Sequence, residues 1–169
     1  ALRPRLLRLQ FGGAVGTLDK LGESGKDVSD ALAAELGVAP SANWHTQRGA
    51  LAALAGWLSE VTGALGKIGQ DISLMAQNEV SEIAISGGGG SSAMPHKQNP
   101  VSAELLVTLA RYNAAQTGGM HQALIHENER SGAAWALEWM ILPQMVLACG
   151  ASLRTAGGLI GRIERIGAE

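Results

Sequence analysis

Apolar residues recur at alternating spacings of three and four along the segment from Thr46 to Gln77. This spacing places them on one stripe of a long helix, as in helical bundles and coiled coils. Glycine and alanine occupy many intervening positions, which favours close packing against neighbouring helices. The stripe consists of Leu51, Leu54, Leu58, Val61, Leu65, Ile68, Ile72 and Met75. We therefore predict a long helix that forms part of a bundle.

Similar signals predict three further helices. A short helix is expected over about residues 26–36, because a glycine follows it as a stop signal. Another should begin after Asn99-Pro100, since Asn caps helices and Pro suits a first helical position, and should continue to about residue 120. The last is expected over about residues 133–163. No segment indicates a sheet, so the predicted fold class is all-α, a long-helix bundle.

The segment from Gln10 to Thr17 contains three glycines within five residues, namely Gly12, Gly13 and Gly16. Glycines are grouped in this way where the chain turns or where another backbone comes close. The sequence leaves both interpretations open.

Composition limits the class of protein. With 169 residues and 46% hydrophobic content, the chain can bury one core, and residues 1–169 are treated as one domain. Both ends interrupt a structural pattern, so we expect an incomplete central domain of a longer protein. The 13 basic and 15 acidic residues form no basic stripe, which argues against a nucleic-acid partner.

The single cysteine and the apolar runs indicate the cellular compartment in which the protein is expected. Cys149 lies in an apolar run and is expected to be a buried thiol, which fits a reducing cytoplasm. No uninterrupted apolar run reaches the roughly 20 residues that a membrane span needs. We therefore expect a cytoplasmic protein with no membrane partner.

The segment from Gly87 to Ser92 is nearly all glycine and serine, and it leads into Met-Pro-x-Lys-x-Asn-Pro, from Met94 to Pro100. Taken alone, such a tract has the composition of a flexible linker. A linker, however, does not need this motif directly before a helix start. Lys97 and the free N–H groups of the helix N-terminus suit an anion site, and the glycines would let the loop open and close over a substrate.

The residues Gly90 to Pro100 resemble the signature loop of the fumarase/aspartase superfamily, Gly-Ser-Ser-x-Met-Pro-x-Lys-x-Asn-Pro, at every fixed position. The resemblance implies that Ser91 is the catalytic base and that Lys97 and Asn99 bind a substrate carboxylate. It also implies that Glu104 pairs with a catalytic histidine from elsewhere in the fold. Ser92, the second serine, is expected to bind substrate or orient the loop.

Three other stretches are similar to the 3-carboxymuconate cycloisomerase branch of that superfamily. They are Gln10 to Thr17, Trp44 to Arg48, and His126 to Ser131, the last followed by Trp135 and Glu138-Trp139. Together with the loop, they extend over nearly the whole chain. The resemblance thus points to a specific reaction as well as to a superfamily.

Four residues of these stretches are candidates for binding substrate carboxylates: Gln47, Arg48, Arg130 and Ser131. A guanidinium and a hydroxyl just ahead of a helix suit a carboxylate. A plainer interpretation remains open for each pair. Gln47 and Arg48 could be solvated residues of a first helical turn, and Arg130 and Ser131 could belong to a surface turn with an ordinary ion pair.

The resemblance implies an intramolecular addition in which 3-carboxy-cis,cis-muconate, a tricarboxylate, closes to 4-carboxymuconolactone in protocatechuate breakdown through the β-ketoadipate pathway. It implies a homotetramer with shared active sites, and no metal or organic cofactor. His126-Glu127 resembles the start of a zinc-binding helix, but Arg130 stands where the second histidine is required. His45 is expected to pack or cap rather than to catalyse.

Two rival functions are considered. An adenylosuccinate lyase of the same superfamily shares the Ala-Met-Pro-His-Lys loop, but the Trp-rich stretch after Arg130 favours the cycloisomerase. A non-catalytic helical assembly protein, such as the lens crystallins of this superfamily, would keep the scaffold alone. The intact Ser91, Lys97 and Asn99 argue against that interpretation. Because the residues that complete each site in the superfamily are missing, the chain alone is expected to be inactive.

Overall fold

The computed structural model describes residues 2–87, 89–90 and 98–167. They belong to two compact units. Unit 1 comprises Ala1–Ala55 and Gly118–Ile141, and unit 2 comprises Gly56–Thr117 and Leu142–Glu169. Each unit thus combines two stretches of chain that are far apart in the sequence.

Unit 1 contains the N-terminal elements α1 (Arg3–Leu6), the 3-10 helix η1 (Asp19–Ser24) and α2 (Gly25–Leu36). α2 agrees with the short helix predicted from the sequence. Its C-cap, Gly37, has a φ of 64°, a left-handed conformation that glycine adopts without strain. The chain then returns alongside the opening segment, where the N–H of Leu9 donates to the carbonyl oxygen of Ala39 at 2.8 Å.

The glycine-rich segment after Phe11 meets both requirements that its sequence left open. Gly13 and Gly16 have positive φ values of 67° and 89°, so the chain turns there. Gly12 and Gly16 also approach each other closely, because a Cβ on Gly12 would lie 2.9 Å from the Cα of Gly16. A Cβ on Gly16 would collide with the side chain of Asn43. The glycines therefore serve both the turn of the chain and the close approach of its neighbouring atoms.

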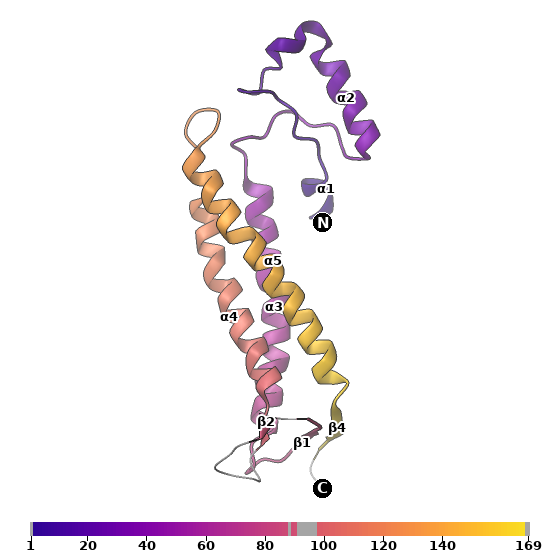
Figure 1. Cartoon of the computed structure of the whole chain (residues 1–169), viewed down its shortest axis with the longest axis vertical. Coiled ribbons are helices and arrows are strands. Elements are labelled where there is room, and N and C mark those ends of the chain that lie inside the picture. The colour runs from indigo at the N-terminus through magenta and orange to yellow at the C-terminus, as the bar shows by residue number, and fades with distance from the viewer. Residues whose placement is uncertain (1, 88, 91–97, 168–169) are drawn as a thin grey trace. The chain divides into compact units, whose positions relative to one another are not determined.

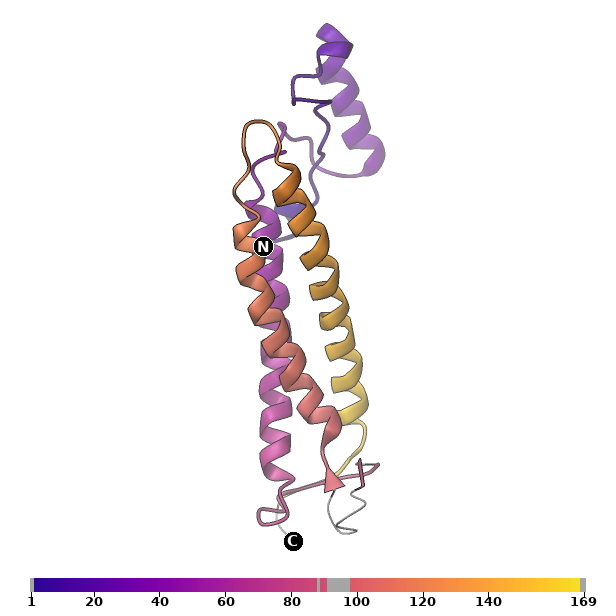
Figure 2. The same cartoon turned by 60° about the vertical axis from the view of Figure 1, so that its left-hand side comes forward.

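Three long helices lie within a few residues of their predicted bounds. α3 spans Gly49–Met75, α4 spans Val101–Gln122 and α5 spans Gly132–Ile160, with Pro143 inside α5. In unit 2 the three helices lie side by side in both views (Figure 1, Figure 2). The prediction of long packed helices is therefore confirmed.

The face that α3 buries in unit 2 keeps Leu58 and Ile72 of the predicted stripe, but between them it lies one position further along the helix. Its small residues Thr62, Gly66 and Gly69 are buried, whereas Ile68 of the predicted stripe is 39% exposed. A Cβ on Gly66 would lie 2.5 Å from the Cβ of Ala110 on α4. A Cβ on Gly69 would likewise lie 2.5 Å from a backbone oxygen of α4. The two helices approach closely because glycine carries no side chain at the contact.

The core of unit 2 lies where the ends of the three helices meet two short strands. It consists of Ile72, Ile83, Ala103, Leu106, Ala156 and Leu159. Farther along α5, Cys149 is buried as predicted, and burial raises the pKa of its thiol.

The expectation that no segment forms a sheet is corrected by two small antiparallel pairs in unit 2. β1 (Ile83–Ile85) pairs with β4 (Ile163–Ile166), and β2 (Gly89–Gly90) pairs with β3 (Gln98–Asn99). Strands this short contain too few residues for an alternating apolar pattern to be recognised. They connect the helix ends, and the bundle remains the main feature of the unit.

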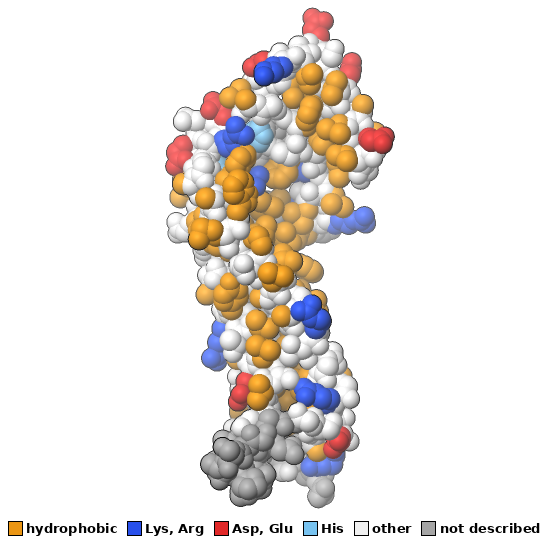
Figure 3. Space-filling model, viewed as in Figure 1, with side chains coloured by type: hydrophobic (Ala, Val, Ile, Leu, Met, Phe, Trp, Pro, Cys, Tyr) orange, Lys and Arg blue, Asp and Glu red, His pale blue; other side chains and the backbone are white. Residues whose placement is uncertain are grey.

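α5 is long and apolar enough to cross a membrane by length and composition, with a mean hydropathy of 1.4 over 18 residues. Glu138 and Pro143-Gln144 interrupt the apolar runs of this helix, so run length and mean hydropathy give different results for it. Only 33% of that window is buried. Large side chains lie exposed along the helix (Figure 3). They are Trp139, Met140, Val146, Leu147, Leu153 and Ile160.

Candidate functional site

The centre of the candidate site in unit 1 is a buried ion pair between Arg48 and Glu138. Nε of Arg48 donates to Oε1 of Glu138 at 2.8 Å, and one Nη donates to Oε2 at 2.6 Å. The two side chains are only 12% and 3% exposed. A two-point contact of this kind fixes the plane of the guanidinium group. Arg48 therefore does not match the plainer interpretation of a solvated residue.

Trp44 supports the same guanidinium group. Cζ of Arg48 lies 5.0 Å from the centre of the Trp44 ring, and so does Cζ of Arg8. The indole N–H of Trp44 donates to the carbonyl oxygen of Leu9 at 2.9 Å, which holds the ring in place. The segment before α3 is thus attached to the N-terminal segment of unit 1.

The loop between α4 and α5 brings His126 to Glu138. The backbone N–H of Ser131 donates to Nδ1 of His126 at 3.2 Å, so the neutral imidazole carries its proton on Nε2. That atom is buried, has no hydrogen-bond partner among the described residues, and lies 3.9 Å from Oε1 of Glu138. The hydroxyl of Ser131 accepts the N–H of Ala134 at 3.4 Å and so caps α5. The loop is thereby tied to the helix that carries Glu138.

His45 and Arg130 both contact Trp135 near this ion pair. The His45 ring meets Trp135 edge-on at 6.4 Å, and Cζ of Arg130 lies 5.0 Å from the Trp135 ring. His45 is buried, as expected for a packed histidine. Burial, and then the positive charges of Arg130 and Arg48, lower the pKa of His45 below its ordinary value of 6.5.

Three of the four predicted carboxylate ligands in unit 1 are connected to this cluster. Arg48 and Ser131 belong to it through their hydrogen bonds, and Arg130 borders it through Trp135. Gln47 is exposed, and within the part of the chain that the structure describes its backbone N–H donates to the carbonyl oxygen of Trp44 at 3.2 Å. Its side chain thus remains available to a ligand.

In unit 2 the predicted residues Asn99 and Glu104 line one open hollow of about 510 Å³. Asn99 ends β3, and Glu104 lies exposed in the first turn of α4. The carbonyl oxygen of Pro100 accepts the N–H of Glu104 at 3.0 Å, which begins the helix. The N–H groups of the first turn of α4 lack helical partners and carry the positive end of the helix dipole.

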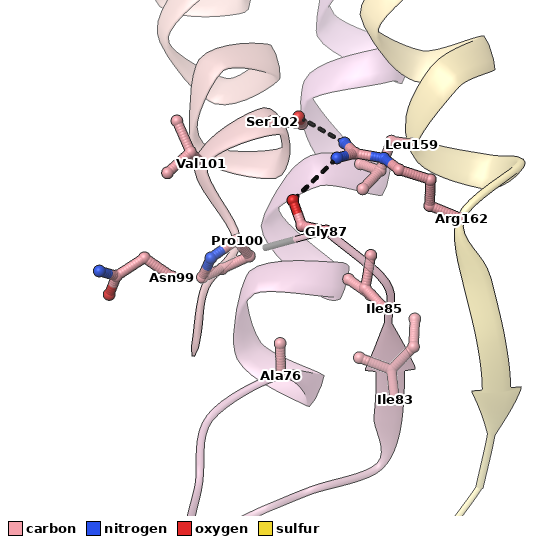
Figure 4. Close-up of a pocket in the computed structure, with 10 residues that line it drawn as sticks. All are labelled: Ala76, Ile83, Ile85, Gly87, Asn99, Pro100, Val101, Ser102, Leu159 and Arg162. Atoms are coloured by element: carbon pink, nitrogen blue, oxygen red, sulfur yellow. Dashed lines mark hydrogen bonds between the residues drawn. The ribbon is translucent and has the colours of Figure 1, made fainter. Parts of the chain in front are cut away.

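A neighbouring hollow of about 60 Å³ contains Arg162 (Figure 4). Its guanidinium group donates to the carbonyl oxygen of Gly87 at 3.2 Å and to the hydroxyl of Ser102 at 2.7 Å. Figure 4 shows the side chain of Asn99 directed away from Arg162. Arg162 thus connects the end of α5 to the residues on either side of the signature loop.

The remaining predicted residues, Ser91, Ser92 and Lys97, lie outside the described residues, as does most of the loop expected to open and close. Among the residues that are described, no group of three or more His, Cys, Asp or Glu side chains is arranged to hold a metal ion. The described part of the site is therefore built from guanidinium, carboxylate, amide and imidazole groups.

Two residues at the site were not predicted from the sequence, Glu138 and Arg162. Glu138 is an acid between Trp135 and Trp139 in an apolar helix, and a buried acid of this kind requires a cationic partner. That signal could have identified it. Arg162 follows Gly161 just after α5, where a basic side chain can bind the last carbonyl oxygens of a helix. Its contacts with Gly87 and Ser102 could not be predicted from the sequence, because both residues are far from Arg162 along the chain.

A family model described as lyase matches residues 1–112. The chain is 47% identical over 167 residues to the 3-carboxy-cis,cis-muconate cycloisomerase of Pseudomonas aeruginosa, and the match covers 96% of this chain and 36% of that protein. It is 43% identical over 151 residues to the protein of the same name from Bradyrhizobium diazoefficiens, covering 87% of this chain and 34% of that protein.

Among solved structures, the 3-carboxy-cis,cis-muconate lactonizing enzyme from Pseudomonas putida is similar, with a TM-score of 0.88 and 41% sequence identity. The match covers 97% of this chain and 36% of that one. The all-α helical fold expected from the superfamily is therefore confirmed. The chain spans about a third of the length of the curated relatives that it matches.

Proposed function

The chain belongs to the lyase family whose model matches residues 1–112, and from this premise we propose that the complete protein is a 3-carboxy-cis,cis-muconate cycloisomerase. The observation that carries this proposal is the 47% identity to the Pseudomonas aeruginosa cycloisomerase along 96% of the chain. The reaction is an intramolecular addition that gives 4-carboxymuconolactone in the cytoplasm, as a step of protocatechuate breakdown. The family assignment within the fumarase/aspartase superfamily supports this chemistry.

In the proposed mechanism one carboxylate oxygen of the substrate forms a C–O bond to a carbon of the conjugated diene. The electron pair of the double bond moves to the neighbouring carbon, where a second carboxylate stabilises the developing carbanion. Ser91, the base of the reverse elimination, then delivers its hydroxyl proton to that carbon, and the alkoxide that remains recovers a proton from water. Lys97, Asn99 and the N–H groups at the start of α4 stabilise the charge that develops on the carboxylate.

The cationic groups of unit 1 support a substrate with three carboxylates. The guanidinium groups of Arg48 and Arg130 lie over the rings of Trp44 and Trp135, and the positive charge of each lowers the pKa of His45. We assign Arg48, Arg130, Ser131 and Gln47 to substrate carboxylates, and Ser92 to substrate or to the loop. The guanidinium groups supply charge and paired N–H donors.

We propose that Glu104 pairs with a histidine supplied from outside this chain, in a homotetramer whose subunits share active sites. Glu104 borders an open hollow of about 510 Å³, which leaves room for such a group. The exposed apolar side chains of α5, together with Ile68 on α3, support packing against further helices. Strictly monomeric behaviour in sedimentation, at concentrations where the complete protein is stable, would contradict this assembly.

The reaction is tested by incubating the complete protein with 3-carboxy-cis,cis-muconate and following loss of the diene absorbance. We expect the absorbance to fall as the lactone forms. Adenylosuccinate is the comparison substrate, because a lyase of that kind would cleave it and leave the muconate unchanged. A tetramer that acts on neither substrate would favour the assembly protein instead.

A further inference from the structure

We propose that Glu138 is a positioning residue, which holds the guanidinium group of Arg48 by one edge and leaves its other edge free for a substrate carboxylate. The inference rests on the proposed function, because it takes the ligand to be the polycarboxylate of that reaction. Glu138 acts through Arg48 and does not itself touch the substrate.

The geometry of the ion pair separates the two edges of the guanidinium group. Glu138 accepts hydrogen bonds from Nε and from one Nη of Arg48, at 2.8 and 2.6 Å. A guanidinium group has five N–H donors in one plane, and this contact uses two of them. The remaining donors point from the far edge, where a second carboxylate can be bound in the same plane. A lysine has no second edge of this kind.

The ion pair also explains why Arg48 contributes more to the orientation of a bound carboxylate than to the electrostatic attraction of an anion. Glu138 is 3% exposed and Arg48 is 12% exposed, and the buried carboxylate neutralises the guanidinium group. The attraction for an anion must then come from other cations such as the exposed Arg130, while Arg48 sets the orientation of the bound carboxylate. Precise placement of Arg48 matters for that task, and Trp44 at 5.0 Å restricts it further.

Glu138 links Arg48 to the other predicted carboxylate ligands of unit 1. His126 lies 3.9 Å from Glu138 through its Nε2, and its Nδ1 accepts the backbone N–H of Ser131 at 3.2 Å. Arg130 precedes Ser131 on the same loop. One buried carboxylate therefore binds a residue before α3 and lies beside a histidine of the loop before α5, which are far apart in the sequence.

A purely structural ion pair is the competing explanation. Buried ion pairs can often be replaced by apolar side chains of similar size without loss of stability, whereas removal of one partner is costly. The replacement of both partners thus separates the two roles. If the pair only supports the fold, an apolar pair should preserve substrate binding as well as stability.

The first test compares the wild-type complete protein with the double variant R48M and E138M. We expect a melting temperature within about 5 °C of the wild type. We expect KM for 3-carboxymuconate to rise at least about tenfold, with a smaller change in kcat, because the lost contact is a charge-assisted hydrogen bond to substrate. A folded double variant with wild-type KM would overturn the proposal.

The second test uses Glu138→Asp, which keeps the charge but withdraws the carboxylate by one methylene. We expect KM to rise about threefold or more, because Arg48 shifts with its partner. Glu35→Asp is the matched control, since Glu35 is exposed on α2 in the same unit. A lower melting temperature with unchanged KM would show a structural role only. This variant decides the question even if the double variant does not fold.

The third measurement separates this inference from the proposed function. Tricarballylate has three carboxylates but no double bond, so its affinity, measured by calorimetry, reports binding without reaction. If the wild type binds tricarballylate and Glu138→Asp, which keeps Arg48, binds it about threefold or more weakly, the inference stands even without lactonisation. If lactonisation occurs and neither variant alters KM or this affinity, only the inference fails. A wild type that neither binds nor reacts overturns both.

Discussion

In unit 1 the Arg48 and Glu138 side chains are buried and bound to each other, whereas in unit 2 Asn99 and Glu104 border an open hollow. Arg48 and Glu138 are 12% and 3% exposed and share two hydrogen bonds. Glu104 is exposed in the first turn of α4. Unit 1 therefore orients its polar groups with its own residues. Unit 2 presents groups that still have room for partners.

The difference suggests that the two units have different roles in the proposed reaction. Buried, mutually bound groups are suited to hold substrate carboxylates in one orientation, because little has to move when the ligand arrives. Groups beside an open hollow are suited to proton transfer, because loop and partner residues can be brought to them.

The largest effect is expected for Arg48→Met alone. It leaves Glu138 buried and unpaired, which should lower the free energy of unfolding of the complete protein by about 3–5 kcal/mol. Glu104→Gln is the comparison in unit 2 and should change it by about 0.5 kcal/mol or less, because Glu104 is exposed. Urea unfolding measures both. Equal losses of unfolding free energy in the two variants would show that the ion pair of unit 1 and Glu104 of unit 2 do not differ in their contribution to stability.

The next effect concerns chemistry rather than folding. Ser91→Ala should lower kcat about a hundredfold or more, the scale of a lost acid or base catalyst, with little change in KM. Lys97→Met should instead weaken substrate binding. Ser92→Ala is the control and should cost less than Ser91→Ala. Steady-state kinetics on 3-carboxymuconate decide, and near-normal kcat in both serine variants would exclude Ser91 as the proton-transfer group.

The helices could be predicted from the sequence because their signals are local. The end of α2 at Gly37 and the start of α4 after Pro100 depend on neighbouring residues alone. The buried face of α3 could not be predicted in the same way. Its contacts use Gly66 and Gly69, and glycine adds nothing to an apolar pattern. The short strands could not be predicted either, because two to four residues are too few for an alternating pattern to be recognised.

The candidate site was predicted in part. Arg48 and Ser131 were identified from their stretches, but their roles in the ion pair and the helix cap were not. The partner of Arg48 lies 90 residues away in the sequence, and no local pattern connects such positions. A buried acid between two tryptophans at Glu138 was the available signal. Arg162 depends on contacts with Gly87 and Ser102 that only the folded chain creates.

A smaller effect is expected where α3 meets α4. Gly69→Ala places a Cβ about 2.5 Å from the backbone oxygen of Ala103 and should destabilise the complete protein by about 1–3 kcal/mol. Gly63→Ala is the matched control on the same helix, because nothing lies within 4 Å of its added Cβ. It should be neutral or stabilising by up to about 1 kcal/mol. Urea unfolding compares the two, and similar losses would show that helix propensity rather than close packing decides.

The smallest effect is the pH dependence contributed by His45 in unit 1. Its pKa is lowered in the folded state by burial and by the charges of Arg130 and Arg48, while the unfolded chain keeps a value near 6.5. The unfolded state therefore binds more protons between the two pKa values. The stability contribution is complete above pH 6.5 and is lost as the pH falls through that window towards the folded pKa. His45→Gln should flatten the decline in unfolding free energy on acidification, as urea unfolding at several pH values would measure. An unchanged pH profile of stability in His45→Gln would mean that burial and the nearby arginines do not disfavour a charged His45. That result would contradict the description of unit 1 as a site whose own buried groups set its charge state.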